Sequence, residues 1–271
     1  MTETGGEWIE DSSGRFVRPG VGDVDLDHPT AMLRRPFSLA GRADAEDGST
    51  EVEIIHRVVG VGTDWMARLV PGDPVDILGP LGNRFTLARE DETALLVGGG
   101  VGIPPMLYLA ATLASRGLHS IAFFGAMSRD LLPVALSGDA TNAPSPCIER
   151  LAKLKIPAVI STDDGSTGVR GFVTAALEQF LDSNRQSAIR NPQFRIYTCG
   201  PELMMKRIAQ IGSERGIPVQ VAVERAMACG MGTCQSCCIR ATVPPEIDPA
   251  GWRYKLACTD GPIFPGDALL W

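Results

Sequence analysis

The chain has 271 residues and a formal net charge of −7, and 44% of its residues are hydrophobic. This length accommodates two domains with a small third module. The acidic balance argues against a general nucleic-acid-binding protein, because neutralising phosphates requires clustered Lys and Arg side chains. The N-terminal stretch MTETGGEWIEDSSG is polar and acidic with no apolar run behind it. We therefore expect no secretory signal, no membrane anchor and a cytoplasmic location.

The first ninety or so residues read as β structure. The segment EVEIIHRVV (51–59) is rich in β-branched residues, and VDIL (75–78) follows a PGDP turn. No helical period interrupts these runs, so we expect strands in this region and no helix.

From Thr93 onwards, short apolar runs alternate with stretches of helical period. The runs include ALLVGGG, IAFFGA, PAVIST and RIYTCG, and the helical stretches include PPMLYLAATLASRG, GFVTAALEQFLDSN and PELMMKRIAQIGSERG. This alternation is typical of a parallel α/β sheet. In the second helical stretch Val173, Leu177 and Phe180 or Leu181 fall on one face, which indicates packing against the sheet.

A glycine-rich turn follows the strand in LLVGGGVGIPP (95–105), and prolines open the next helix. This arrangement presents backbone N–H groups and a helix dipole to a pyrophosphate. The full G-x-G-x-x-G pattern is not met, so a plain tight turn stays an alternative. TCGP (198–201) also ends a strand and starts a helix, so it should open at the same carboxyl edge of the sheet.

Two segments of the β region also suit a phosphate. RRPFSLA (34–40) combines Arg35 with a hydroxyl at Ser38, and VVGVGT (58–63) places glycines after a strand. An ordinary corner of a β structure is the alternative for both.

Four cysteines near the C-terminus have the C-x4-C-x2-C spacing, followed by a distant cysteine, that is typical of a plant-type [2Fe–2S] cluster. Gly230 and Gly232 between them allow the backbone to curl around a small inorganic core. A four-cysteine zinc site and unligated buried thiols are the alternatives, although only one C-x-x-C knuckle is present. The candidate ligands are Cys229, Cys234, Cys237 and Cys258.

The cysteine count indicates a reducing compartment. Seven cysteines, four of them in one group, do not make a disulfide framework. We expect Cys147 and Cys199 to be free thiols, and Cys238 to point away from the group that contains its neighbour Cys237.

The motifs RRPFS, VVGVGT, DILGPLGNRF, GGGVG, TDDGSTG and CGP precede the cysteine-rich tail in a fixed order. In this order the chain resembles the ferredoxin-reductase-like flavoproteins, and more narrowly the electron transfer subunits of NAD-linked dihydroorotate dehydrogenase. The resemblance implies an N-terminal antiparallel FAD-binding β-barrel (1–91), an α/β NAD-binding domain with a parallel sheet (92–222) and a small C-terminal [2Fe–2S] module (223–271). Only thirty-four residues precede Arg35, which leaves a truncated barrel open.

The resemblance also assigns roles residue by residue. Contact with FAD falls to Arg35, Pro36, Phe37, Ser38, Ile55, His56 and Arg57, with Gly62 and Thr63 at its pyrophosphate. NAD binding falls to Gly99, Gly100, Gly102, Cys199, Gly200 and Pro201. The cluster ligands are Cys229, Cys234, Cys237 and Cys258. No side chain is assigned as a catalytic acid or base, because hydride transfer requires none.

The function that the resemblance implies is electron transfer in pyrimidine biosynthesis. An FMN-containing catalytic subunit oxidises dihydroorotate, and the electrons pass through the [2Fe–2S] cluster and FAD to NAD⁺ within a heterotetramer. A reductase subunit of a cytoplasmic hydrogenase, a ferredoxin:NADP oxidoreductase and a non-catalytic metal-binding protein are the alternatives. Ser128 and Arg129 leave the choice between NAD and NADP open.

Overall fold

The computed structural model describes residues 9–10, 16–17, 34–185 and 193–271. The chain divides into two compact units, the first comprising residues 1–34 and 58–74 and the second residues 35–57 and 75–271. In the part of the chain described here, no helix is long and apolar enough to cross a membrane.

The first unit contains a helix that the sequence did not predict. Its described elements are an antiparallel pair, β1 (Ile9–Glu10) and β2 (Phe16–Val17), and the helix α1 (Val61–Ala67). The hydroxyl of Thr63 accepts hydrogen bonds from the N–H groups of Val59 (2.9 Å) and Gly60 (3.1 Å), which satisfies donors at the start of this helix. Seven residues are too few to show a helical period, so propensity and pattern gave no signal.

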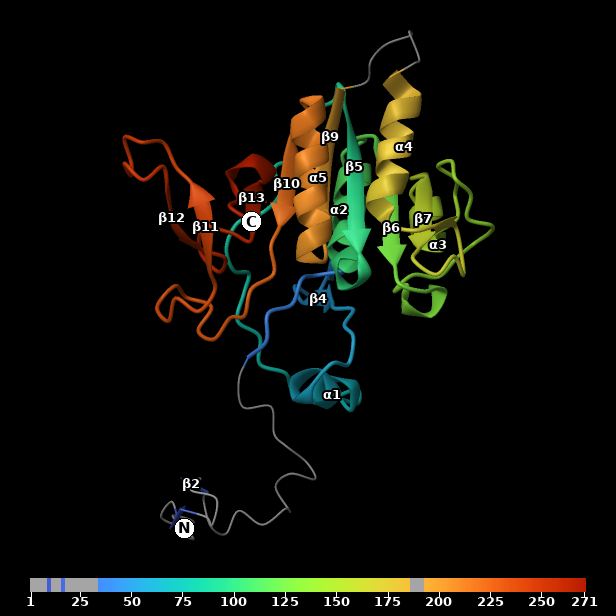
Figure 1. Ribbon diagram of the computed structural model, residues 1–271. Helices are drawn as coiled ribbons and strands as arrows, with labels where there is room; N and C mark the ends of the chain where they lie inside the picture. Colours follow the sequence, from blue (N-terminus) through green and yellow to red (C-terminus); the bar gives the residue numbers. More distant parts are fainter. Residues whose placement is uncertain (1–8, 11–15, 18–33, 186–192) are drawn as a thin grey trace. The chain divides into compact units, whose positions relative to one another are not determined.

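The second unit is built on a seven-stranded sheet with the order β13-β10-β9-β5-β6-β7-β8 (Figure 1). Adjacent strands are parallel except that β13 pairs antiparallel with β10. The strands are β5 (Glu92–Gly99), β6 (Ser120–Ala126), β7 (Ala158–Thr162), β8 (Val169–Arg170), β9 (Gln193–Cys199), β10 (Val219–Ala222) and β13 (Ile263–Pro265). The parallel α/β sheet predicted from Thr93 onwards is confirmed, and the cysteine-rich tail adds β13 to it.

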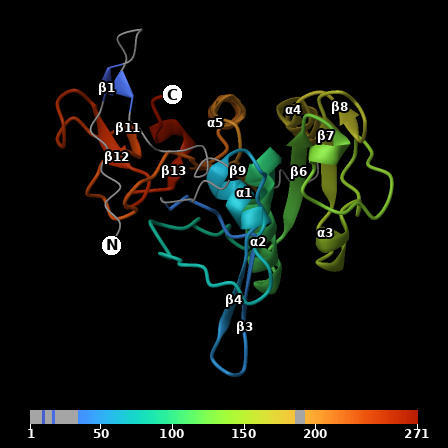
Figure 2. The same cartoon turned by 90° about the horizontal axis from the view of Figure 1, so that it is seen from below.

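Helices cover both faces of this sheet. They are α2 (Ile103–Ser115), α3 (Glu149–Lys153), α4 (Val173–Arg185) and α5 (Glu202–Arg215). The helices α4 and α5 lie on one side of the sheet and α2 and α3 on the other (Figure 2). Each pair contributes side chains to one of two buried clusters. Because both faces are covered, the central strands are almost continuously apolar. The predicted face of α4 is confirmed, since Val173, Leu177 and Leu181 are all buried and Phe180 packs against them.

Shorter elements flank the sheet. A hairpin of β3 (Gly41–Asp44) and β4 (Thr50–Glu53) precedes the sheet in the chain, and a second antiparallel pair, β11 (Cys238–Thr242) and β12 (Trp252–Leu256), comes between β10 and β13. The 3₁₀ turns are η2 (Gly100–Gly102), η3 (Arg129–Leu131) and η4 (Gly266–Ala268).

Strand structure before Glu92 is shorter than the sequence predicted. The expected β run 51–59 forms a strand only as far as Glu53, and the run 75–78 forms none. All four side chains of β4 are exposed. The β propensity of branched residues depends on packing against neighbouring strands, and among the described residues β4 pairs only with β3.

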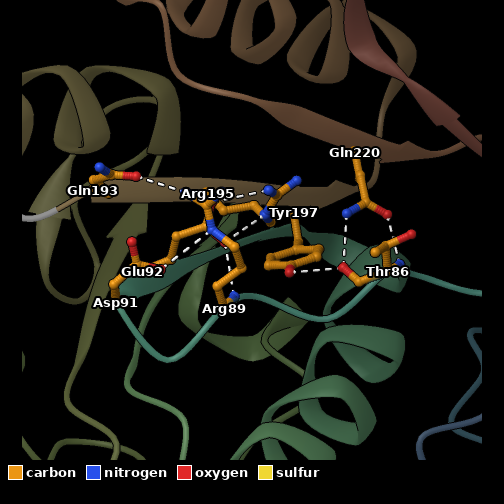
Figure 3. Close-up of polar contacts among 8 residues, drawn as sticks. All are labelled: Thr86, Arg89, Asp91, Glu92, Gln193, Arg195, Tyr197 and Gln220. Atoms are coloured by element: carbon orange, nitrogen blue, oxygen red, sulfur yellow. Dashed lines mark hydrogen bonds and ion pairs between the residues drawn. The ribbon is translucent and has the colours of Figure 1, made fainter.

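The segment that leads into β5 is fastened to the sheet by polar contacts (Figure 3). The carbonyl of Thr86 accepts hydrogen bonds from the hydroxyl of Tyr197 (2.9 Å) and from the amide of Gln220 (2.8 Å), whose carbonyl accepts the N–H of Thr86 (2.8 Å). Burial raises the pKa of Tyr197 above its usual range, so this hydroxyl stays a donor. The segment therefore keeps a fixed position on β9 and β10.

A buried ion pair lies beside these contacts at the amino end of the sheet (Figure 3). Both carboxylate oxygens of Glu92 accept hydrogen bonds from the guanidinium of Arg195, each at 2.9 Å. The N–H of Arg89 donates a third bond at 2.8 Å. These contacts join the starts of β5 and β9.

Candidate functional site

Two glycine loops meet at the carboxyl edge of the parallel sheet. Gly99 ends β5 and Gly102 lies in the turn that follows, whereas Cys199 ends β9 and Gly200 follows it. A Cβ atom on Gly102 would overlap the carbonyl of Cys199, and one on Gly200 would lie 2.9 Å from the carbonyl oxygen of Gly99. The two loops thus approach backbone to backbone, which only glycine allows.

This arrangement brings together the residues that the sequence predicted for NAD binding. Pro201 precedes α5, and the first turn of α2 contains a proline, as predicted. The N-terminus of α2 opens at the edge where Gly100, with a positive φ of 53°, has free space in the direction of a Cβ. The positive end of a helix dipole and bare glycine backbone suit a pyrophosphate. The site fits a dinucleotide.

Cys199, the last residue of β9, carries a thiol of low reactivity. The pKa of this thiol is raised to about 12, mainly by burial and to a smaller extent by the nearby carboxylate of Glu224. The thiol is therefore protonated at neutral pH and is a poor nucleophile. Cys147 and Cys199 are both free, as predicted.

The residues predicted for flavin contact lie at the open end of the β3–β4 hairpin. The segment 35–38 enters β3, the segment 55–57 leaves β4, and the N–H of Ala40 donates to the carbonyl of Glu53 at 2.7 Å. The rings of Phe37 and His56 meet edge to face, with centroids 6.2 Å apart. Arg35, Pro36, Phe37 and Ser38 are exposed.

The chemistry of these side chains fits a flavin nucleotide. A guanidinium and a hydroxyl can bind phosphate and ring oxygens, and an aromatic ring can pack against the flavin. Ile55 and His56 are half-buried and Arg57 is exposed. The predicted pyrophosphate contacts Gly62 and Thr63 lie in the first unit, at the start of α1.

Two of the four predicted cluster ligands, Cys229 and Cys234, are linked directly by a hydrogen bond. The sulfur of Cys229 accepts hydrogen bonds from the N–H groups of Met231 (3.3 Å) and Cys234 (3.4 Å). Positive φ angles at Gly230 (71°) and Gly232 (83°) turn the loop around that sulfur. Such N–H···S bonds stabilise thiolate charge, and they tune iron–sulfur clusters.

The other thiols differ in their exposure. Hydrogen bonds from Ser236, followed by those from Cys229, lower the pKa of the exposed Cys234 to about 6. Burial, followed by the neighbouring Cys237 and Cys229, raises the pKa of Cys258. Cys237 is buried and Cys238 is exposed. In the described ranges, no group of three or more His, Cys, Asp or Glu side chains forms a ready site for a single metal ion.

Family profiles match two parts of the chain. One is described as an oxidoreductase NAD-binding domain and matches residues 96–210. The other is described as the iron–sulfur cluster binding domain of dihydroorotate dehydrogenase B and matches residues 224–270, which include all four predicted ligands.

Curated relatives cover nearly the whole chain. The dihydroorotate dehydrogenase B (NAD(+)) electron transfer subunit of Desulforamulus reducens is 31% identical over 258 residues, 95% of this chain and 86% of the relative. The subunit of the same name from Fusobacterium nucleatum is 33% identical over 254 residues, 93% of this chain and 84% of the relative. The chain belongs to this family. The resemblance seen in the sequence motifs is confirmed.

Solved structures support the fold of this electron transfer subunit family. An NADH-dependent reduced ferredoxin–NADP oxidoreductase that acts by flavin-based electron bifurcation matches with a TM-score of 0.68 and 27% identity, over 88% of this chain and 75% of its own. The Amycolatopsis cytochrome P450 reductase GcoB matches with a TM-score of 0.51 and 24% identity, over 69% and 54%, and shows the fold alone. The predicted ferredoxin-reductase-like fold and the NAD-binding and iron–sulfur domains are confirmed.

Proposed function

We propose that this chain is the electron transfer subunit of an NAD-linked dihydroorotate dehydrogenase in pyrimidine biosynthesis. It receives electrons from an FMN-containing catalytic subunit that oxidises dihydroorotate, and delivers them through a [2Fe–2S] cluster and FAD to NAD⁺. The observation that carries the proposal is the similarity to curated subunits of that name, which extends over 95% of the chain and includes the cysteine-rich tail. A cytoplasmic heterotetramer is part of the proposal.

Each cofactor has its residues in this proposal. Cys229, Cys234, Cys237 and Cys258 bind the cluster, and the glycine loops of residues 99–102 and 199–201 bind NAD. The two ends of the β3–β4 hairpin bind FAD, together with Gly62 and Thr63. The proposal keeps the domain boundaries that the sequence predicts after residues 91 and 222.

The chain's own residues hold and orient these groups. FAD, when bound, exchanges a hydride with nicotinamide and single electrons with the cluster. The close approach of Gly99, Gly102 and Gly200 leaves bare backbone where a dinucleotide can lie. The raised pKa of Cys199 keeps its thiol protonated there and makes it a poor nucleophile. No acid or base is required, because a hydride carries its proton and two electrons together.

Reconstitution with a partner tests the proposal. The anaerobically purified chain should show flavin bands together with the broad absorption of a [2Fe–2S] centre. Added to an FMN-containing dihydroorotate-oxidising subunit, it should form NADH only when dihydroorotate is present. A colourless preparation that contains zinc would contradict the cofactor assignment. A cofactor-loaded chain that does not couple to this partner would contradict the assignment of the partner.

A ferredoxin:NADP oxidoreductase subunit is the second candidate. It is favoured by the structural match to a protein of that activity over 88% of the chain. The discriminating measurement is reduction of the bound flavin by reduced ferredoxin, compared with reduction by dihydroorotate and its dehydrogenase. Faster reduction by ferredoxin, with no coupling to dihydroorotate, would favour this candidate.

A further inference from the structure

A single arginine of the NAD-binding part holds both ends of the β3–β4 hairpin. The guanidinium of Arg150 donates a hydrogen bond to the carbonyl of Ala40 at 2.9 Å and pairs with the carboxylate of Glu53 at 2.7 Å. Ala40 lies two residues after Ser38, and Glu53 lies two residues before Ile55. The two chain segments assigned to flavin contact therefore leave the hairpin next to this guanidinium.

Arg150 is itself firmly attached to the parallel sheet. It lies on α3, between the buried side chains of Ile148 and Leu151. Ile148 bridges to Leu136, and the N–H of Ser145 just before it donates to the carbonyl of Ala158 in β7 at 3.0 Å. The start of the helix that carries Arg150 is therefore anchored next to the sheet whose carboxyl edge forms the dinucleotide site.

Gly41 leaves the space that the contact needs. A Cβ atom on Gly41 would lie 2.6 Å from a carboxylate oxygen of Glu53 and 2.9 Å from a guanidinium nitrogen of Arg150. A larger residue there would require the ends of these two side chains to shift. The hairpin also contacts α2, on the same side of the sheet as α3 (Figure 2).

The ion pair is too exposed to act mainly on folding. The side chains of Arg150 and Glu53 are 37% and 47% exposed, and pairs of this kind contribute little to stability. A guanidinium presents its donors in a rigid fork, so it can bind a carbonyl and a carboxylate at once. A lysine carries the same charge but has no such fork. The arrangement suits positioning.

We propose that Arg150 is a positioning residue that fixes the flavin-contact segments relative to the dinucleotide site, and so sets the geometry of hydride transfer. The proposal rests on the proposed function, in which FAD lies at the ends of this hairpin. Hydride transfer moves two electrons and one proton together from NADH to flavin, which leaves NAD⁺ and reduced flavin, and in the physiological direction the reverse. Its rate falls steeply when the reacting atoms are misplaced by about 1 Å.

Two independent variants of the full chain test the role. Arg150→Lys removes the fork and keeps the charge, and Gly41→Ala displaces the same groups from the other side. Arg42→Lys is the matched control, because Arg42 lies in β3 next to Gly41 and donates its hydrogen bonds to Asp44 within the hairpin. The measurements are the anaerobic single-turnover rate of flavin reduction at saturating NADH, the NAD⁺ and FAD dissociation constants, and hydrogen exchange of the backbone amides of residues 40–53.

We expect both variants to reduce their flavin at least about tenfold more slowly than the wild type. Their NAD⁺ affinity and cluster absorbance should be unchanged, and the amides of the hairpin should exchange faster even without FAD. The control should match the wild type in every measurement. Wild-type rates, or wild-type exchange in the hairpin, in both variants would overturn the role of Arg150. A wild-type chain that binds no FAD would instead contradict the proposed function.

Discussion

Replacing Glu92 by Gln tests the energetic role of the buried pair at the amino end of the sheet. The carboxylate is only 3% exposed and accepts two charge-assisted hydrogen bonds from Arg195 and one from the backbone of Arg89. The amide retains one acceptor oxygen, removes the charge, and turns an NH₂ group towards the guanidinium donors. The guanidinium of Arg195 then lies largely buried, at 20% exposure, without a counter-charge.

The expected cost follows from these contacts. Hydrogen bonds to charged groups contribute about 1.5–3 kcal/mol each, and removal of one partner of a buried pair costs about 3–5 kcal/mol. Partial exposure of Arg195 and the retained acceptor place Glu92→Gln near the lower end, at about 2–3 kcal/mol. With a slope of about 2.5 kcal/mol per M urea, the midpoint of unfolding should fall by about 1 M.

The ionisation of Glu92 also makes the free energy of unfolding depend on pH. The hydrogen bonds from Arg195 lower the pKa of Glu92 below its ordinary value of 4.5. Stability contributed by a group with a lowered folded-state pKa is complete above the unfolded-state pKa and is lost as the pH falls through the folded-state value. The wild type should therefore lose this contribution below about pH 4.5, whereas Glu92→Gln has none to lose.

Urea unfolding followed by circular dichroism, at pH 7 and in steps down to pH 3.5, measures both effects. Asp91→Asn is the matched control, since Asp91 is an exposed neighbour that pairs with Arg89 at 3.2 Å and should change stability by less than about 0.5 kcal/mol. Equal midpoints for the two variants, or parallel acid profiles for Glu92→Gln and the wild type, would refute the reasoning.

Three further predictions follow from the core and the sites. Leu177→Ala, at a fully buried position of α4, should cost about 2.7–5 kcal/mol by urea unfolding; a cost below 1 kcal/mol would mean that α4 does not pack as described. Gly102→Ala should weaken NAD⁺ binding at least about tenfold in calorimetry, because the new Cβ overlaps the carbonyl of Cys199. Gly138→Ala, where a Cβ has free space, should bind NAD⁺ as tightly as the wild type does. Equal NAD⁺ affinities of Gly102→Ala and Gly138→Ala would argue against the close approach of the two loops. Cys234→Ser should remove the cluster absorption and retain NADH-to-dye reduction through FAD; loss of both together would show that the two modules do not function separately.

The sequence predicted the chain from Glu92 onwards better than the part before it, for a physical reason. In the parallel sheet, burial on both faces forces apolar runs of strand length, and the helices between them carry a clear period, as at Val173 and Leu177. Before Glu92, β4 is exposed and α1 has only seven residues. Neither element therefore produces a hydrophobic pattern from which its position could be predicted. The run 51–59 was therefore predicted as one strand, of which only the first part forms.

The candidate site divides in the same way between local and long-range information. The cluster motif is local, because the spacing of Cys229, Cys234 and Cys237 and the intervening glycines determine the loop around one sulfur. The close approach of Gly102 to Cys199 depends on the order of strands in the sheet, which gives neighbours to residues far apart in the sequence. Arg150 carries no motif at all. Its proposed role follows only from two contacts made across the fold, with Ala40 and Glu53, so the sequence alone would class this arginine as a solvated surface charge.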